Sequence, residues 1–285
     1  WLKGYKVPEG SRQSKGKPII NMISDLEPEE KVETVVSVKE YSDDRYMVFC
    51  TKNGLVKRTV LSAYSNVRAK GIKAIKLEEG DELIETHISD GGSEIIIATR
   101  EGQACRFDES EVNPTGRDTM GVKGVTLDKG DFVVSMALVS PGDKLLSISE
   151  NGYGKISEVD DYRKTHRGGK GVRTLVTDER NGKVVSVRKV DLDDQLMVIS
   201  QQGKIIRMNV GGISLMSRRT KGVRIMNLSE GDVVMSVQPL AVKEDLTDEE
   251  VPVQDPEDAS EEAPAEAPVE ASEPPADWSE GNDGA

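Results

Sequence analysis

The sequence contains few of the residues on which enzymes and nucleobase-stacking proteins depend. Aromatic residues make up only 4% of the 285 residues, and there are two histidines and two cysteines. His87 and His166 are too few and too far apart in the sequence for a metal site or a catalytic triad, and Cys50 and Cys105 lack metal-ligand spacing. We therefore expect no catalytic residue, no metal and no cofactor in this chain, and no single-strand binding by stacked aromatic rings.

Long apolar segments are also missing. No apolar run approaches the roughly 18 residues that a membrane-spanning helix needs, and the N-terminal residues do not form a signal peptide. These absences favour a cytoplasmic protein with reduced cysteines. The chain begins at Trp1 and not at Met, and we interpret it as a piece of a longer protein. Its core must rest on Val, Ile, Leu and Met.

Acidic charge is concentrated at one end of the chain. The formal net charge is −13, from 38 Lys and Arg against 51 Asp and Glu. Residues 241–285 hold sixteen acidic residues and a single basic one, Lys243, whereas the remainder holds 37 basic and 35 acidic residues. Because this end segment is also rich in proline and poor in large apolar residues, we predict that residues 241–285 form a disordered acidic tail. The remainder is slightly basic.

What the sequence does contain is a repeat of about fifty residues. One series of glycines, with separations of 48, 50 and 51 residues, consists of Gly54, Gly102, Gly152 and Gly203. A second series, with separations of 50, 50 and 51 residues, consists of Gly71, Gly121, Gly171 and Gly222. A Gly-Asp pair recurs at residues 80–81, 130–131 and 231–232, and Asn181-Gly182 takes its place in the remaining unit. Such regularity indicates one structural unit repeated along the chain.

Each unit reads as a small antiparallel sheet. Short β-branched runs precede the first glycine at residues 46–49, 95–97, 145–148 and 196–199, and the glycine closes a hairpin by adopting positive φ. Two more strands follow in each unit, so we predict four-stranded antiparallel blades. Repeated units of this kind form a propeller-like disc, in which neighbouring blades bury each other's faces. The fold class is therefore all-β, with a partial blade at residues 1–40, whose last strands we expect between residues 26 and 38, and blades at about 41–90, 91–140, 141–190 and 191–240.

Basic residues gather around the second glycine of every unit. They are Arg12, Lys15, Lys17, Arg68, Lys70, Lys73, Arg117, Lys123, Arg163, Lys164, Arg167, Lys170, Arg173, Arg218, Arg219, Lys221 and Arg224. Equivalent positions in successive blades point to equivalent places on a disc, so these residues predict a ring of positive charge along one rim. Such a rim can bind duplex DNA through its phosphates and repay the energy of bending it, without reading the bases.

Simpler explanations exist for parts of this pattern. One charged loop alone is most often only a solvated loop, and Lys-Gly is favourable turn chemistry, which we accept for the glycines themselves. Five basic loops in register require a further reason. We expect the tyrosines Tyr46, Tyr64, Tyr153 and Tyr162 to pack, and residues 151–154 to form a hairpin turn, not a phosphate-binding loop.

Several stretches resemble the C-terminal domain of the DNA gyrase A protein. They are residues 5–9 (YKVPE), 17–21 (KPIIN), 80–84 (GDELI), 150–155 (ENGYGK) and 177–182 (TDERNG), and the resemblance spans residues 1–240. It implies a six-bladed β-pinwheel, a propeller variant whose blades exchange strands, of which this chain would keep the later part of the second blade and the last four. The family's hallmark sequence would precede Trp1, and a similar sequence at residues 167–171 (RGGKG) belongs to a later blade.

The resemblance also implies a function. In that family the domain wraps duplex DNA so that gyrase, an ATP-dependent type II topoisomerase, introduces negative supercoils. The catalytic residues, ATP and Mg²⁺ would lie elsewhere in the heterotetramer of gyrase A and gyrase B, in a bacterial cytoplasm and on the nucleoid. The acidic tail would be a flexible polyanion that competes with DNA for the basic rim.

Two alternatives remain at this point. The chain could be the corresponding domain of topoisomerase IV, which has fewer or degenerate blades; five traceable units and a long acidic tail favour gyrase. It could also be a β-propeller scaffold for protein–protein interaction, in which case duplex binding would be absent or insensitive to salt.

Overall fold

The computed structural model describes residues 4–9, 17–23, 30–68 and 71–240. In this part the regular structure consists of fifteen β-strands and six short 3₁₀ helices. The 3₁₀ helices are η1 (Gly4–Lys6), η2 (Ile19–Met22), η3 (Leu61–Tyr64), η4 (Glu109–Glu111), η5 (Val159–Asp161) and η6 (Val210–Gly212). The prediction of an all-β, propeller-like fold is confirmed. The predicted acidic tail, residues 241–285, lies outside the described residues.

The strands form four antiparallel sheets, which we call blades 1 to 4. In hydrogen-bonded order, blade 1 contains β3 (Leu83–Ser89), β1 (Tyr46–Thr51), β2 (Leu55–Val60) and β6 (Val122–Lys123). Blade 2 contains β10 (Val172–Arg173), β5 (Gln103–Asp108), β4 (Glu94–Thr99) and β7 (Val133–Val139). Blade 3 contains β11 (Val184–Val190), β8 (Lys144–Ser149), β9 (Tyr153–Glu158) and β14 (Val223–Arg224), and blade 4 contains β13 (Ile205–Asn209), β12 (Gln195–Ser200) and β15 (Val234–Leu240).

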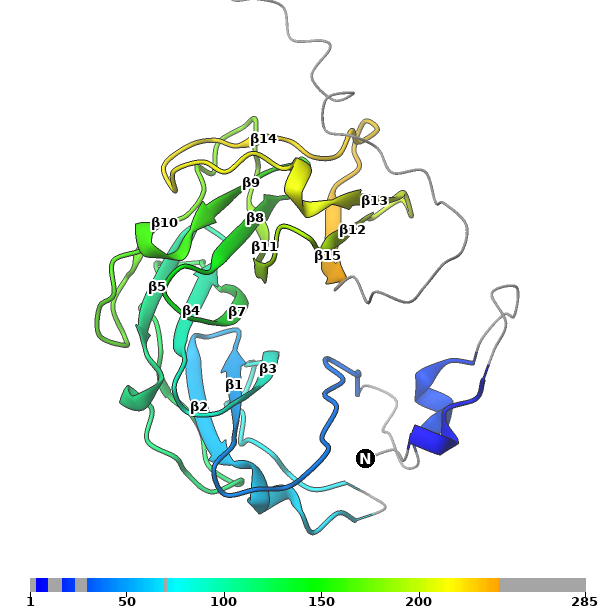
Figure 1. Cartoon of the computed structure of the whole chain (residues 1–285), viewed down its shortest axis with the longest axis vertical. Coiled ribbons are helices and arrows are strands. Elements are labelled where there is room, and N and C mark those ends of the chain that lie inside the picture. Colours follow the sequence, from blue (N-terminus) through cyan, green and yellow to red (C-terminus); the bar gives the residue numbers. More distant parts are fainter. Residues whose placement is uncertain (1–3, 10–16, 24–29, 69–70, 241–285) are drawn as a thin grey trace, which may run out of the picture.

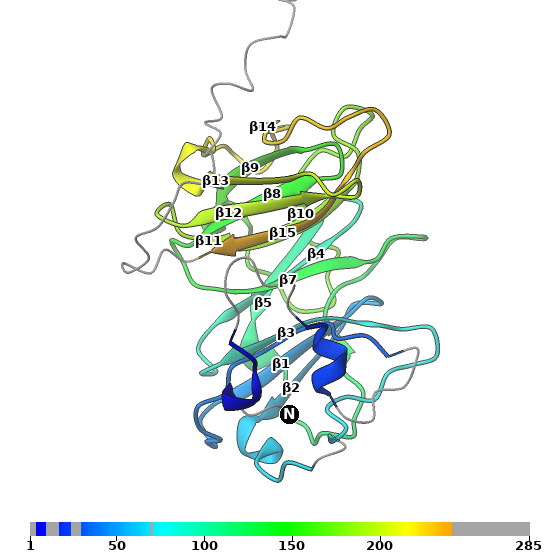
Figure 2. The same ribbon diagram turned by 90° about the vertical axis from the view of Figure 1, so that its right-hand side faces the viewer.

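The blades stand side by side in an arc (Figure 1), with β3, β7, β11 and β15 on its inner side. The perpendicular view in Figure 2 shows the same sheets stacked along the long axis of the molecule. The core lies between neighbouring blades. On β4, for example, Ile95 and Ile97 pack toward blade 1, while Ile96 packs toward blade 3. Both faces of this strand are buried, which explains its unbroken apolar run.

Each of the first three blades takes its outermost strand from the following repeat. The short strands β6, β10 and β14 pair with β2, β5 and β9, respectively, across the boundary between repeats. The sequence repeat alone suggested four consecutive strands per unit; the exchange was implied by the family resemblance. Within the described residues blade 4 has three strands, all from its own repeat.

The second series of glycines makes this exchange possible. A Cβ atom on Gly121, Gly171 or Gly222 would lie 2.7, 2.2 or 2.4 Å from a backbone carbonyl oxygen of the strand that it meets. The reason for these glycines is thus a close approach of two backbones, and turn chemistry alone does not account for them. Gly171 and Gly222 also have positive φ.

The first series of glycines and the Gly-Asp pairs act together in the hairpins. Gly54, Gly102, Gly152 and Gly203 have φ between 80° and 84°. The Oδ1 atom of Asp131 accepts hydrogen bonds from its neighbour Phe132 and from the amide of Glu101 in the hairpin turn, at 2.8 and 3.0 Å. Asp81 and Asp232 make the same pair of bonds in their own blades. The recurring carboxylate therefore ties one turn of the blade to another, which is a structural role.

The region before blade 1 differs from the prediction. We expected strands between residues 26 and 38, but residues 30–38 form no strand, and residues 24–29 lie outside the described part. Residues 4–9 and 17–23 lie across the arc from the blades (Figure 1), whereas Val38 and Tyr41 pack against blade 1. Three predicted site residues, Arg12, Lys15 and Lys70, also fall outside the described residues.

Candidate nucleic-acid interface

The basic loops of blades 2, 3 and 4 occupy equivalent places. Each loop begins after a 3₁₀ helix and crosses the edge of the preceding blade before it enters the exchanged strand. The amides of Thr115, Thr165 and Met216 donate hydrogen bonds of 2.8 Å to the carbonyls of Arg58, Arg106 and Ile156 in the preceding blade. Strands β10 and β14 accordingly lie on the outside of the arc (Figure 1). Three successive basic loops are thus fixed in the same geometry along the outer edge.

Two buried lysines support two of these three loops, those of blades 2 and 4. Lys57 of β2 donates to the carbonyl of Arg117 at 2.7 Å, and Lys155 of β9 donates to the carbonyls of Ser217 and Thr220 at 2.9 Å. Both residues are at most 1% exposed. Burial, assisted by the charge of Arg117 or Arg218, lowers the pKa of each lysine to about 8. These lysines are structural supports of the loop and are not available to an external ligand.

The Lys155 support predicts a characteristic pH dependence. The pKa of Lys155 is about 8 in the folded chain and 10.5 without the protein environment, so between these values the unfolded chain holds more protons. Its contribution to the free energy of unfolding should therefore rise with pH from about 8 to about 10.5. Urea unfolding of the wild type and of Lys155→Met at several pH values measures this contribution as the difference between the two free energies of unfolding. Burial raises the pKa of the thiols Cys50 and Cys105, but their titration is the same in both proteins and cancels in the difference. A difference that does not change with pH would contradict the assignment.

The structure divides the predicted basic residues into two groups. Six are held by other groups: Lys164, Lys170 and Lys221 form ion pairs with Asp108, Asp128 and Asp178, and Arg167, Arg218 and Arg224 bond to carbonyl or side-chain oxygens. In the part of the chain that the structure describes, eight others have no ion pair or side-chain hydrogen bond: Lys17, Arg68, Lys73, Arg117, Lys123, Arg163, Arg173 and Arg219. All eight are exposed except Arg117, which is half-buried. The side chains of these eight residues can therefore contact the phosphates of an external ligand without first breaking an interaction within the chain.

Sequence reasoning missed the residues that place the loops. Lys57 and Lys155 occupy the same position in their repeats, within otherwise buried strands, and this was the signal that could have identified them. Arg106 was missed as well: its guanidinium contacts Glu94 of blade 2 and the carbonyls of Val159 and Tyr162 of blade 3. His166 lies within a basic loop, where it is exposed and its Nδ1 is 3.3 Å from a carboxylate oxygen of Glu111.

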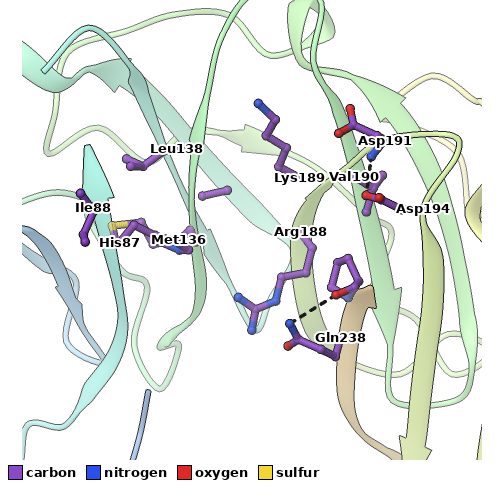
Figure 3. Close-up of a pocket in the computed structure, with 12 residues that line it drawn as sticks. His87, Ile88, Met136, Leu138, Arg188, Lys189, Val190, Asp191, Asp194 and Gln238 are labelled. Atoms are coloured by element: carbon purple, nitrogen blue, oxygen red, sulfur yellow. Dashed lines mark hydrogen bonds between the residues drawn. The ribbon is translucent and has the colours of Figure 1, made fainter. Parts of the chain in front are cut away.

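A second polar cluster lies on the inner side of the arc (Figure 3). His87, Arg188 and Gln238, from three different blades, line a cavity of about 410 Å³. Apolar side chains and the charged residues Lys189, Asp191 and Asp194 complete its lining. The buried Glu85 pairs with Arg188, lies 3.3 Å from His87 and accepts a hydrogen bond from the amide of Met136. Burial lowers the pKa of His87. Because acidic and basic groups offset each other here, this cluster joins blades and is not part of the basic surface.

Among the described residues, no group of three or more His, Cys, Asp or Glu could hold a metal ion. The described part of the chain likewise contains no helix with the length and apolar character needed to cross a membrane.

Comparison with known proteins identifies the family. The model of the DNA gyrase C-terminal domain, a beta-propeller, matches five segments of the chain: residues 1–39, 45–89, 93–140, 143–191 and 194–241. The chain belongs to this family. The resemblance inferred from sequence is thereby confirmed, and the match is to a part of a type II topoisomerase that is not catalytic.

Full-length relatives support the same family. The chain is 47% identical over 236 residues to the DNA gyrase A protein of Clostridium acetobutylicum, covering 83% of this chain and 28% of the relative. It is 45% identical over 251 residues to the DNA gyrase A protein of Staphylococcus aureus strain NCTC 8325, covering 87% of this chain and 28% of that relative. The chain thus spans less than a third of the length of these relatives.

Solved structures show the same architecture. A DNA gyrase A C-terminal domain superposes with a TM-score of 0.72 at 28% identity, covering 80% of this chain and 76% of that one. The C-terminal domain of a DNA topoisomerase IV superposes equally well, with a TM-score of 0.73 at 28% identity, covering 79% and 70% of the two chains. The fold therefore does not separate gyrase from topoisomerase IV; the family model and the full-length relatives favour gyrase.

Proposed function

We propose that the chain binds and wraps duplex DNA along its basic outer edge, as part of gyrase, so that the ATP-dependent enzyme introduces negative supercoils. The observation that carries this proposal is the equivalent placement of three successive basic loops, each fixed to the preceding blade. A duplex that follows this edge meets unpaired cations at each blade, and neutralising its phosphates releases counterions. The bend costs a few kcal/mol, which many phosphate contacts can repay.

The assembly follows from the family and is part of the proposal. The remainder of gyrase A, together with gyrase B, would supply DNA cleavage, ATP and Mg²⁺, in the cytoplasm of a bacterium and on its nucleoid. Within the chain, residues 1–240 would form the wrapping domain and residues 241–285 an acidic tail. The predicted basic residues would contact phosphates, with the eight unpaired ones contributing most.

Wrapping can be tested by topology. When the chain is incubated with nicked circular plasmid and the nick is then sealed, we expect the deproteinised plasmid to retain a linking-number difference that grows with protein concentration. The physical reason is that DNA held in a curved path around the arc cannot relax while it is bound. Two-dimensional gel electrophoresis measures the sign and size of the change.

A linear duplex in the same buffer serves as the binding control. Binding that weakens steeply with salt, without any trapped linking number, would contradict wrapping but leave DNA binding intact. Absence of both would contradict the function itself and favour a protein-interaction scaffold.

A further inference from the structure

Tyr153 lies between two arginines at the outer edge of blade 3. The guanidinium of Arg180 is 4.4 Å from the centroid of the Tyr153 ring, and that of Arg224 is 5.4 Å from it. Arg224 also donates two hydrogen bonds to the Tyr153 hydroxyl, from Nε at 3.3 Å and from Nη2 at 2.8 Å. The tyrosine therefore has specific polar partners. The sequence analysis predicted only that it would pack against its neighbours.

The three residues come from three separate segments. Tyr153 is the first residue of β9, Arg224 lies opposite it on the exchanged strand β14, and Arg180 belongs to the turn that precedes β11. In the other blades the place of Tyr153 is taken by Leu55, Gln103 or Lys204, as the aligned hairpins show. Among the described blades, this arrangement occurs only in blade 3.

The chemistry of the group suits an anion. Arg180 and Arg224 are exposed, and within the described residues neither forms an ion pair with a carboxylate. Because the Tyr153 oxygen accepts from Arg224, its own proton remains available to donate. Burial raises the pKa of this hydroxyl, but the hydrogen bonds and charges of Arg224 and Arg180 outweigh burial and lower it. The guanidinium of Arg180, which stacks on the ring, keeps its in-plane N–H groups free. Arg224 donates to Tyr153 and, from Nη1, to Asn227 at 3.4 Å, but each of its Nη nitrogens retains a second N–H.

We propose that Tyr153, Arg180 and Arg224 form a clamp for one phosphodiester group of duplex DNA. This proposal rests on the DNA-binding function proposed above and adds Arg180 to the basic edge. A phosphate oxygen can accept from the Tyr153 hydroxyl while the two guanidiniums supply charge-assisted hydrogen bonds. The ring holds both arginines in place before DNA arrives, so little side-chain entropy is lost on binding. Tyr153 is therefore a positioning residue as well as a donor.

The test compares point variants of the full chain for binding to a short linear duplex, by fluorescence anisotropy at several salt concentrations. Arg180→Gln should lower affinity about tenfold and reduce the salt slope by about 0.9. Lys129→Gln is the matched control, because Lys129 holds the corresponding exposed position in blade 2 without a stacking partner. It removes the same charge and should have a much smaller effect.

Tyr153→Leu separates positioning from charge. Leucine occurs naturally at the equivalent position 55. We expect this variant to bind about fivefold more weakly with an unchanged salt slope, because the charges remain but are no longer held. Tyr153→Phe keeps the stack and loses the hydroxyl, so its affinity should lie between those of the wild type and the leucine variant.

The outcomes distinguish this proposal from the one on which it rests. If the wild type binds DNA but Arg180→Gln and Lys129→Gln lose affinity equally, or Tyr153→Leu lowers only the melting temperature, the clamp is overturned and the stack is merely structural. If the wild type itself binds no duplex, the proposed function fails and the clamp fails with it.

Discussion

Replacing Arg106 by methionine should lower the free energy of unfolding by about 3 kcal/mol. The Arg106 side chain is only 7% exposed and its Nε lies 2.5 Å from Oε2 of Glu94, whose side chain is 11% exposed. Its Nη1 also donates to the carbonyls of Val159 and Tyr162 in the next blade, at 2.8 and 3.0 Å. Methionine fills similar space but leaves Oε2 of the buried Glu94 and the Tyr162 carbonyl without the donor that Arg106 supplies. Lys164 still pairs with Oε1 of Glu94 at 2.9 Å, and the Tyr162 amide still donates to the Val159 carbonyl, so the expected loss is at the lower end of the range for a broken buried ion pair. Urea unfolding at neutral pH measures the loss.

Arg100→Met is the matched control for this prediction. Arg100 also pairs with a glutamate of the neighbouring blade, Glu150, at 2.7 Å, but the two side chains are 35% and 23% exposed. Because solvent screens the two charges, such a pair contributes no more than about 1 kcal/mol to the free energy of unfolding. Equal losses for the two variants would show that burial of the Arg106 pair does not set its energetic importance.

The repeat made much of the fold predictable from the sequence. Glycine spacing located every hairpin, because a tight turn between β-strands requires positive φ and leaves few residues able to supply it. The buried runs before these glycines located the first strand of each blade. The exchanged strands were different: β6, β10 and β14 are two residues long, and their partners lie in the preceding repeat. A local pattern cannot contain that information, although the glycines that permit the close approach were visible.

The candidate site was predictable only in part, for a related reason. The sequence showed where basic residues gather, but which of them are free depends on carboxylates brought from elsewhere. Lys164 pairs with Asp108, and Lys221 with Asp178, across gaps of 56 and 43 positions in the chain. Arg180 was not among the predicted site residues, because it lies outside the basic loops. Its contact with the Tyr153 ring exists only once the blades have folded. The sequence thus shows where the basic surface lies, but only the folded structure shows which of its side chains lack an ion-pair partner.

Neutralising the free basic residues should have the largest effect on DNA binding. The variant carries glutamine at six exposed positions that have no partner in the described part of the chain: Arg68, Lys73, Lys123, Arg163, Arg173 and Arg219. Each lost phosphate contact should reduce the slope of log affinity against log salt by about 0.9, and affinity at low salt should fall roughly a thousandfold or more. Filter binding or anisotropy over a series of salt concentrations measures both quantities.

A second variant with the same change in net charge tests whether position matters. It carries glutamine at six basic positions away from these loops: Lys39, Lys52, Arg100, Lys144, Lys183 and Lys189. Five of them form ion pairs with a glutamate or aspartate. If DNA follows the outer edge, this variant should keep most of the salt slope, because exposed charges beyond about 10 Å from a phosphate are screened at moderate salt. Equal losses in the two variants would mean that overall charge, and not the arrangement of the basic loops, governs binding.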